Sequence, residues 1–214
     1  MAVQRDPESS SSGTREKILD VAEDLIARDG FENLKLKEIA ERLGIRSPSI
    51  FAHYAGRDAV VSAVVLRYLH SLDDQFLADG RDDPTGGLMD GIRHLVRQWA
   101  THPAYVRLCL RDLEYPHGMP EAHWKLEGSA LENALSGPIG AMIARLKAIL
   151  DRGYELGEFR EMDVITVYRQ ILGAVLVIFT IPSQKLLSAD TSRAELEVAI
   201  REVEDLILRF VQPA

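Results

Sequence analysis

Cysteine is almost absent from this sequence: Cys109 is the single one among 214 residues. One cysteine cannot form an internal disulfide, which excludes a disulfide-stapled scaffold and favours a reducing compartment. The longest apolar run, residues 171–181, is too short to cross a bilayer and is typical of a helix buried on most of its faces. The first residues, MAVQRDPESSSSG, lack the apolar segment of a signal peptide. We therefore expect a cytoplasmic protein with a disordered leader over residues 1–13.

Basic residues are outnumbered by acidic ones, 25 against 33, which gives a formal net charge of −8. This balance argues against a nucleic-acid partner for the chain as a whole. Residues 30–57 differ from the rest, since five bases minus three acids leave +2 in that window. The bases are Lys35, Lys37, Arg42, Arg46 and Arg57, and the acids are Glu32, Glu38 and Glu41. Surface charges are often only solvated, so this excess is a weak indication by itself.

The sequence shows no strand-like alternation and no internal repeat, whereas apolar residues recur at helical spacings of three and four. We predict an all-α protein with helices over 14–30, 35–43, from 48, 58–77, 88–100, 104–113, 121–135, 139–150, 163–181 and 193–210. Ser136-Gly137-Pro138 either separates two helices or kinks one, which gives about nine helices in all. The 46% hydrophobic composition suffices for a sizeable core.

A helix, a glycine turn and a second short helix follow each other around Gly44. The glycine supplies the positive φ of a tight turn, and Ala40 is small enough for a close helix crossing. Ile45 and Ile50 are placed to fill the angle between the two helices, against Ile39. This is the layout of a helix-turn-helix motif.

With those residues inward, a polar face remains, and a second helix of this kind enters the major groove of DNA. Arg46 is suited to a bidentate pair with guanine, and Ser47 and Ser49 to a base or a phosphate. Phosphate contacts are expected from Lys35, Lys37, His53, Tyr54 and Arg57, which position the protein without reading sequence. The alternative is a plain helical hairpin in which His53 and Tyr54 pack inward.

Residues 14–65 resemble the N-terminal DNA-binding domain of TetR-family transcriptional regulators. The resemblance rests on the RxxIL start at Arg15, the Gly30-Phe31 pair, the stretch IAERLGI and the ending FAHY-x-x-Arg-Asp. It implies a three-helix helix-turn-helix head over residues 14–57 on a helical ligand-binding and dimerisation body over residues 58–214. The usual action in such a family is repression that a small molecule relieves.

The chain departs from the family pattern at four positions. Lys35 stands where Thr or Ser is common and cannot cap the helix that follows. Phe51 replaces a frequent Tyr, Tyr54 replaces the usual Phe, and Arg57 replaces a Lys. The expected DNA-binding residues are Lys35, Lys37, Arg46, Ser47, Pro48, Ser49, Phe51, His53, Tyr54 and Arg57.

The last helix carries apolar residues at spacings of four, three, four and three, which is a coiled-coil-like seam. The monomer core is one interpretation of this seam. The family pattern instead implies a four-helix bundle with a second copy, built from Ile171, Val175, Ile178, Leu196, Ile200, Val203, Ile207 and Phe210. A homodimer would place two recognition helices about 34–36 Å apart on a near-palindromic operator.

The middle helices carry aromatic and sulfur side chains that form either a plain core or the mostly apolar effector pocket expected of the family. The candidates are Phe76, Trp99, Tyr105, Cys109, Trp124, Met142 and Tyr168. Two arginine pairs at a spacing of four, Arg93 with Arg97 and Arg107 with Arg111, indicate either solvated faces or an anionic ligand. The histidines have no metal-ligand spacing, so we assign no metal, no cofactor and no catalytic residue.

Three functions follow from these observations. The first is a ligand-responsive regulator, a repressor, in which the ligand moves the helix over residues 58–77 and so separates the recognition helices from the DNA. The second is a protein-interaction module that has lost DNA binding, which the acidic net charge favours. The third is an enzyme on a helical bundle, for which the sequence lacks a convergent catalytic set.

Overall fold

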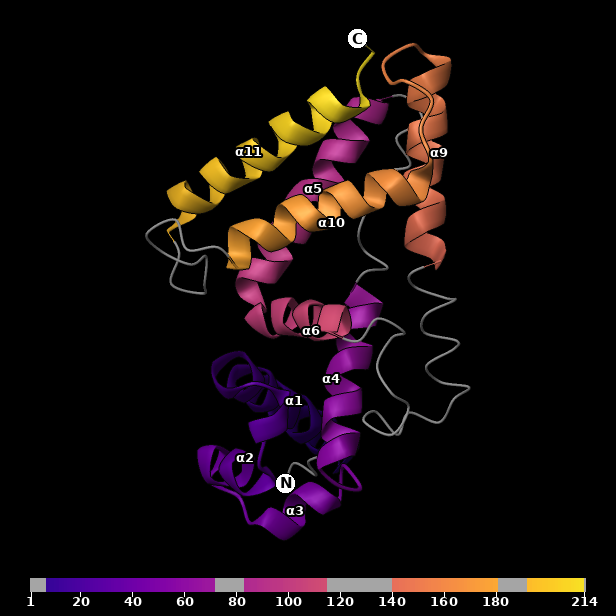
Figure 1. The fold of residues 1–214 in the computed structure, drawn as a ribbon. Helices are drawn as coiled ribbons and strands as arrows, with labels where there is room; N and C mark the ends of the chain where they lie inside the picture. The colour runs from indigo at the N-terminus through magenta and orange to yellow at the C-terminus, as the bar shows by residue number, and fades with distance from the viewer. Residues whose placement is uncertain (1–6, 72–82, 115–139, 181–191, 214) are drawn as a thin grey trace, which may run out of the picture. The chain divides into compact units, whose positions relative to one another are not determined.

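Helices make up all the regular structure in the part of the chain that the computed structural model describes, residues 7–71, 83–114, 140–180 and 192–213. Their order along the chain is shown in Figure 1. They are α1 (Pro7–Asp29), the 3₁₀ helix η1 (Phe31–Asn33), α2 (Leu36–Leu43), α3 (Ser47–Phe51), α4 (Arg57–Ser71), α5 (Pro84–Thr101), α6 (Pro103–Glu114), α9 (Gly140–Glu155), α10 (Val164–Thr180) and α11 (Arg193–Val211). The predicted all-α class is confirmed. The predicted helix over 121–135 lies outside the described residues.

The chain divides into two compact units, residues 1–67 with 107–130 and residues 68–106 with 131–214. One of the boundaries falls inside α4, directly after Arg67, and another inside α6, directly before Arg107. Each of these two helices is therefore divided between the two units. The expected boundary after residue 57 differs from this division, because most of α4 groups with α1, α2 and α3.

In the first unit α1 begins at Pro7, earlier than the expected start at Thr14, and proline suits the first turn of a helix. Gly30 ends α1 as expected, with φ of 83° and ψ of 165°, a backbone conformation that is essentially restricted to glycine. The core that α1 shares with the following helices contains Ile18, Ala22, Leu25, Ile26, Phe31, Ile39, Ile50, Val60 and Val64, all at most 4% exposed.

The second unit is built around α5, which packs against α9 and α11, while α10 packs against α9 and α11 (Figure 1). Helix α5 starts at a well-formed cap, because the Asp83 carboxylate accepts a hydrogen bond from the Gly86 amide at 2.7 Å and Pro84 follows. Helix α11 starts at a capping box formed by Ser192 and Glu195. The turn after α9 closes over Gly153, whose carbonyl accepts hydrogen bonds from two amides.

The seam predicted to meet a second copy lies largely inside the second unit. Ile171, Val175, Ile200, Val203 and Ile207 are at most 2% exposed in the single chain. They have no surface left to bury against a partner, so the core interpretation of these five residues is the correct one.

Three members of the seam, Ile178, Leu196 and Phe210, keep partial exposure. The Phe210 ring is covered by the Arg160 guanidinium, 5.0 Å from the ring centre. The apolar side chains that α10 and α11 do expose are Ile165, Val177, Val198 and Leu206.

Among the described residues, no helix combines the length and the apolar character needed to cross a membrane.

Candidate nucleic-acid and ligand sites

The turn between α2 and α3 is formed by Gly44, as the sequence predicts. Its φ of 65° and ψ of 28° lie in the left-handed region. The Gly44 amide donates to the Glu41 carbonyl at 3.2 Å, and the Ile45 amide donates to the Ala40 carbonyl at 3.0 Å. These two bonds satisfy the last carbonyls of α2 and set the direction in which α3 leaves it.

Helix α3 is five residues long and is oriented by one buried side chain. Ile50 is 0% exposed and lies with Ile39, also 0% exposed, and Ala40, 1% exposed, in the core of the first unit. Pro48 stands in the first turn, where its fixed φ favours a helix and its missing amide is not needed. The Ser49 amide donates to the Arg46 carbonyl at 2.8 Å.

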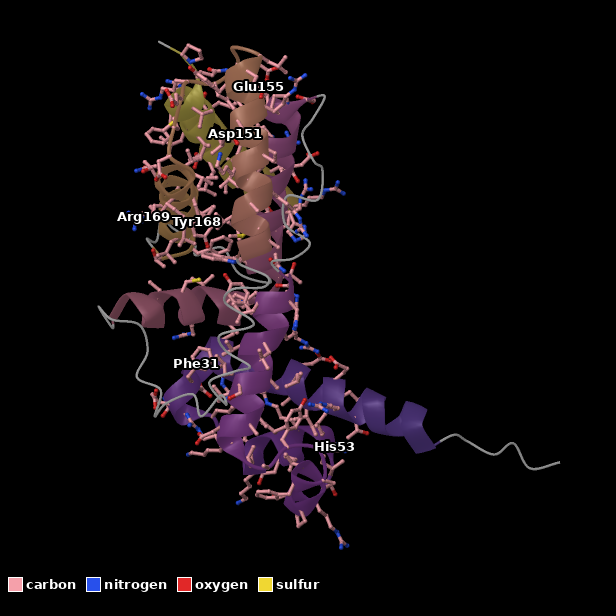
Figure 2. All side chains as sticks on the ribbon, turned by 90° about the vertical axis from the view of Figure 1, so that its right-hand side faces the viewer. Phe31, His53, Asp151, Glu155, Tyr168 and Arg169 are labelled. Carbon is pink, nitrogen blue, oxygen red and sulfur yellow. The ribbon has the colours of Figure 1, made fainter. Side chains whose placement is uncertain are left out.

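The opposite face of α3 points to solvent. Arg46, Pro48, Ser49 and Phe51 are exposed, with Phe51 at 56%, and Ser47 is half-buried. His53, labelled in Figure 2, follows α3 and is half-buried as well. Six of the predicted DNA-binding residues thus share one accessible surface.

The cations near this face differ in how far their charge is already paired. Lys37 lies 3.6 Å from Glu41, in an exposed ion pair that contributes little to stability. Arg42 forms an ion pair with Asp24 on α1, which reduces the unpaired positive charge of residues 30–57. Within the described part of the chain, the side chains of Lys35 and Arg46 form no hydrogen bond and no ion pair. Lys35 precedes α2 without capping it, as expected.

Tyr54 does not lie on the outward face. Its side chain is only 4% exposed, and its hydroxyl donates to the Arg15 carbonyl of α1 at 3.4 Å. Burial raises the pKa of the Tyr54 hydroxyl, and Arg15, whose guanidinium stands 5.1 Å from the ring centre, offsets only part of the rise. The inward interpretation weighed for this residue is therefore correct, and a phosphate contact from Tyr54 is not supported.

Arg57 is likewise occupied inside the first unit. Its guanidinium donates to the carbonyls of Leu34, at 3.2 Å, and Phe31, and lies 3.2 Å from Asp58. These carbonyls belong to η1 and the residue that follows it, so Arg57 joins the start of α4 to the connection between α1 and α2. The expectation that Arg57 is a phosphate contact is corrected to this positioning role.

Two further arginines hold α1 through contacts that no sequence pattern indicated. Arg67 on α4 lies 2.9 Å from Glu23, 2.6 Å from Glu16 and 2.8 Å from Asp20. Burial lowers the pKa of Arg67, but the hydrogen bonds to these three carboxylates outweigh it and raise that pKa above its ordinary value. Arg107 on α6 donates to the carbonyl of Ala27 at 2.6 Å, near the C-terminus of α1. Arg107 thus caps a helix, which leaves no support for the anionic-ligand interpretation at this position.

The predicted ligand-binding residues do not gather around one cavity in the described part of the chain. Trp99, Tyr105 and Met142 are at most 2% exposed and belong to the core. Cys109 and Tyr168, the latter visible on α10 in Figure 2, are half-buried. Phe76 and Trp124 lie outside the described residues. Tyr105 instead joins two rings, Tyr68 at 4.4 Å and His102 at 5.0 Å between ring centres.

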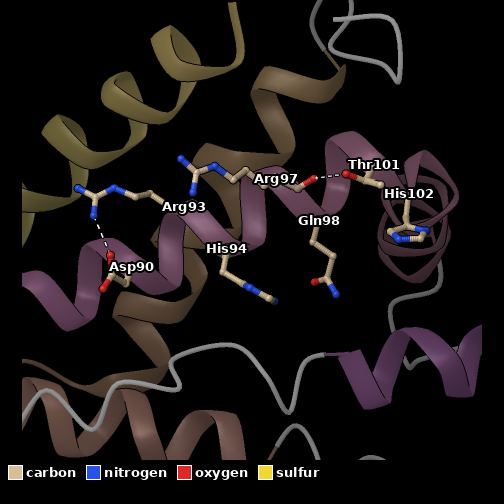
Figure 3. A pocket seen from close by; sticks show the side chains of 7 residues that line it. All are labelled: Asp90, Arg93, His94, Arg97, Gln98, Thr101 and His102. Atoms are coloured by element: carbon tan, nitrogen blue, oxygen red, sulfur yellow. Dashed lines mark hydrogen bonds and ion pairs between the residues drawn. The ribbon is translucent and has the colours of Figure 1, made fainter. Parts of the chain in front are cut away.

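An open hollow of about 460 Å³ lies along the polar side of α5 (Figure 3). Its lining residues are Asp90, Arg93, His94, Arg97, Gln98, Thr101 and His102. They recur three and four positions apart, a spacing that places them on one side of the helix and that is visible in the sequence. Its lining includes the polar residues Asp90, Gln98 and Thr101, so this hollow is not the mostly apolar pocket that the family resemblance implies.

Both arginines of the hollow are already paired with carboxylates. Arg93 lies 2.8 Å from Asp90 and 2.6 Å from Glu204 on α11. Arg97 lies 2.9 Å from Glu197, and its hydrogen bond lowers the pKa of that carboxyl. In the described residues, no three His, Cys, Asp or Glu side chains are grouped so that they could hold a metal ion.

The glycine turn, the inward Ile50 and the exposed polar face of α3 define a protein of the helix-turn-helix class. Residues 18–64 match the model of the family described as bacterial regulatory proteins, tetR family. This match covers the N-terminal helix-turn-helix domain, from α1 into α4.

The chain is also similar to individual transcriptional regulators. The HTH-type transcriptional repressor KstR2 of Rhodococcus jostii (strain RHA1) is 30% identical over 80 residues, which cover 36% of this chain and 39% of that protein. The TetR family regulator PfmR from Thermus thermophilus shares 25% identity, with a TM-score of 0.68 over 90% of this chain and 97% of its own. The ketosteroid transcriptional regulator KstR2 of Mycobacterium tuberculosis has the same fold, with 20% identity and a TM-score of 0.61 over 100% and 99% of the two chains.

Proposed function

We propose that this chain is a cytoplasmic transcriptional repressor that binds a near-palindromic operator as a homodimer and is released by a small molecule. One observation carries the DNA-binding part: α3 is anchored inward by Ile50 while Arg46 stands exposed beside it with its charge unpaired. The similarity to KstR2 of Rhodococcus jostii, which is named a repressor, supports repression.

The outward residues divide by the chemistry each can offer. Arg46 reads a guanine through two parallel hydrogen bonds, and Ser49 donates to a neighbouring base or phosphate. Phe51 makes an apolar contact in the groove, since its exposed ring offers no hydroxyl. Lys35 and Lys37 bind phosphates, together with Ser47 and His53 at the edges of the face.

The dimer face we propose is the outward side of α10 and α11 rather than the buried seam. Val177, Val198 and Leu206 are 46–56% exposed, which is unusual for apolar residues on two adjacent helices. Gly173 is exposed one turn before Val177, and a side chain there would meet nothing within 4 Å. A glycine at that place lets a helix of a second copy come close. The twofold axis would set the two recognition helices about 34–36 Å apart.

Release would pass through the two helices that belong to both units. Arg67 of α4 and Arg107 of α6 hold α1, and each is adjacent in sequence to a residue of the second unit, Tyr68 and Val106. A ligand that favours another position of Tyr68 and Tyr105, whose rings are 4.4 Å apart, would shift α4 and α6 together. The altered position of α1 would then move α3 out of register with the operator.

The DNA-binding proposal is tested by fluorescence anisotropy with DNA from the region upstream of the chain's own gene. Arg46→Ala is expected to weaken binding about 5- to 150-fold, equivalent to about 1–3 kcal/mol. The matched control is Arg152→Ala, which removes an equally charged side chain from α9, where it pairs with Glu155 at 3.0 Å. The control should bind as the wild type does.

The salt dependence of binding separates the regulator from a protein-interaction module. A regulator that neutralises several phosphates loses affinity steeply as salt rises, and Lys35→Ala should reduce the slope of log K against log salt by about 1. Absence of DNA binding by the wild type at about 50 mM salt, where phosphate contacts are strong, would refute the proposal and favour the interaction module.

A further inference from the structure

Two polar side chains in the hollow of α5 are half-buried, and each has one buried atom without a hydrogen-bond partner in the described part of the chain. The His94 Nε2 and Gln98 Oε1 atoms are inaccessible to solvent, and neither makes a hydrogen bond there. Figure 3 shows both side chains pointing to the same side of α5, away from Arg93 and Arg97. An unsatisfied buried polar atom keeps its full desolvation penalty, which folded proteins rarely retain without a use.

We infer that His94 and Gln98 are the anchor of an effector site for an uncharged small molecule that carries an amide or hydroxyl group. The residues are four apart on one helix, so their side chains are neighbours on its surface. Gln98 Oε1 is an acceptor and needs a donor from the ligand, while His94 Nε2 donates or accepts according to its tautomer. An amide or a hydroxyl supplies both functions from one group. The inference rests on the proposed function, in which the second unit takes the effector.

The arginine charges of the hollow are already met by carboxylates, which disfavours an anionic ligand. Arg93 pairs with Asp90 and Glu204, and Arg97 pairs with Glu197. An anion would have to displace one of these carboxylates. A cation would have to lose its hydration shell next to two neutral groups, which costs more than burying a neutral amide. The volume of about 460 Å³ is in the range of small-molecule sites.

The site also lies at the start of the route proposed for release. His102 lines the hollow and stacks on Tyr105, with 5.0 Å between ring centres and 17° between planes. Tyr105 in turn contacts Tyr68 of α4 at 4.4 Å. A ligand held by His94 and Gln98 thus occupies the hollow that His102, the first ring of this stack, also lines.

Three probes of one shape and different charge test the inference on the full-length protein. They are benzamide, benzoate and benzylamine, and the measurements are the shift of Tm and saturation-transfer NMR. Benzamide at a concentration equal to its Kd should raise Tm by about 1–2 °C, and the two charged probes should have smaller effects. A larger shift from benzoate or benzylamine, or no shift from any probe, would overturn the inference.

Apolar substitutions give an independent readout. Gln98→Leu and His94→Phe remove the unsatisfied atoms, so each should raise Tm by about 2–4 °C while abolishing the benzamide shift. Thr101→Val is the matched control, because the Thr101 hydroxyl already donates to the Arg97 carbonyl at 2.9 Å. It should lower Tm slightly and keep the benzamide shift. A fall in Tm for both Gln98→Leu and His94→Phe would show that the chain itself uses these groups and would overturn the site.

These measurements contain no DNA and therefore do not depend on whether the chain binds an operator. A wild type without DNA affinity would refute the proposed function and leave the benzamide result intact. A wild type that binds DNA but ignores benzamide would refute the site alone.

Discussion

Replacing Arg67 by methionine should destabilise the first unit more than the loss of a surface ion pair would. Arg67 is 24% exposed and holds three carboxylates of α1, of which Glu23 is 9% exposed and Glu16 and Asp20 are 58% and 64% exposed. The two exposed pairs contribute together about 0–1 kcal/mol. The pair with Glu23 decides the outcome, because Arg67→Met leaves a buried carboxylate without its cation.

The magnitude follows from that burial. Removing one partner of a buried pair costs about 3–5 kcal/mol. Glu23 keeps another interaction within the chain, and water reaches the space left by a partly exposed arginine, so about 2–3 kcal/mol is expected from this pair. With the outer pairs the total is about 3 kcal/mol, or a fall in Tm of about 6–12 °C for a chain of this length.

A double-mutant cycle with Glu23→Gln tests the cause. The amide is not charged, so Arg67→Met should cost less in the Glu23→Gln background, with a coupling free energy of about 1.5–2 kcal/mol from urea unfolding. Arg209→Met, which breaks an exposed pair with Asp205 on the same helix, should change stability by less than about 0.5 kcal/mol. Additive single costs, or a loss below about 0.5 kcal/mol for Arg67→Met, would refute the assignment of the burial penalty to Glu23.

Three further substitutions follow from backbone geometry, packing and titration. Gly44→Ala should lower the free energy of unfolding in urea by about 1–2 kcal/mol through the positive φ alone, because a side chain there meets nothing within 4 Å. Gly44→Asn should lower it less, since Asn tolerates the left-handed region, and equal losses would contradict this reason. Gly153→Ala should cost about 1–3 kcal/mol or more by the same assay, since its Cβ would clash with the ring of Phe159, whereas Gly140→Ala, with open space around it, should not destabilise. Because the pKa of Tyr54 is raised in the folded state, its neutral hydroxyl contributes stability that is fully present below the unfolded pKa of about 10 and is lost as pH rises through the folded pKa. The urea midpoint of Tyr54→Phe should therefore fall less between about pH 8 and about pH 11 than that of the wild type.

The sequence was sufficient for features whose cause is local. The left-handed Gly44, the inward Ile50 and the failure of Lys35 to cap α2 all follow from the chemistry of a single residue at a known place in a helix. The outward polar face of α3 follows from the same periodicity.

Features that depend on distant partners could not be predicted in this way. Arg57, Arg67 and Arg107 are all cations that a sequence offers equally to phosphate, ligand or solvent. Their acceptors include backbone carbonyls. Every residue has a carbonyl, so residue identity does not show which one accepts the hydrogen bond. The five buried residues of the seam were assigned to a second copy for a related reason, since a spacing of four and three gives the apolar side of a helix but not the identity of the helix that covers it.

The shortness of α3 separates the stability of the fold from the identity of its exposed side chains. A helix of five residues cannot persist alone, so its geometry is supplied by Gly44, Ile50 and the buried Tyr54 next to it. The exposed side chains Arg46, Ser49 and Phe51 add almost nothing to that support. They can therefore be exchanged in combination without loss of folding. Under the proposed function, new operator preferences can thus be selected at three positions while the rest of the chain stays as it is.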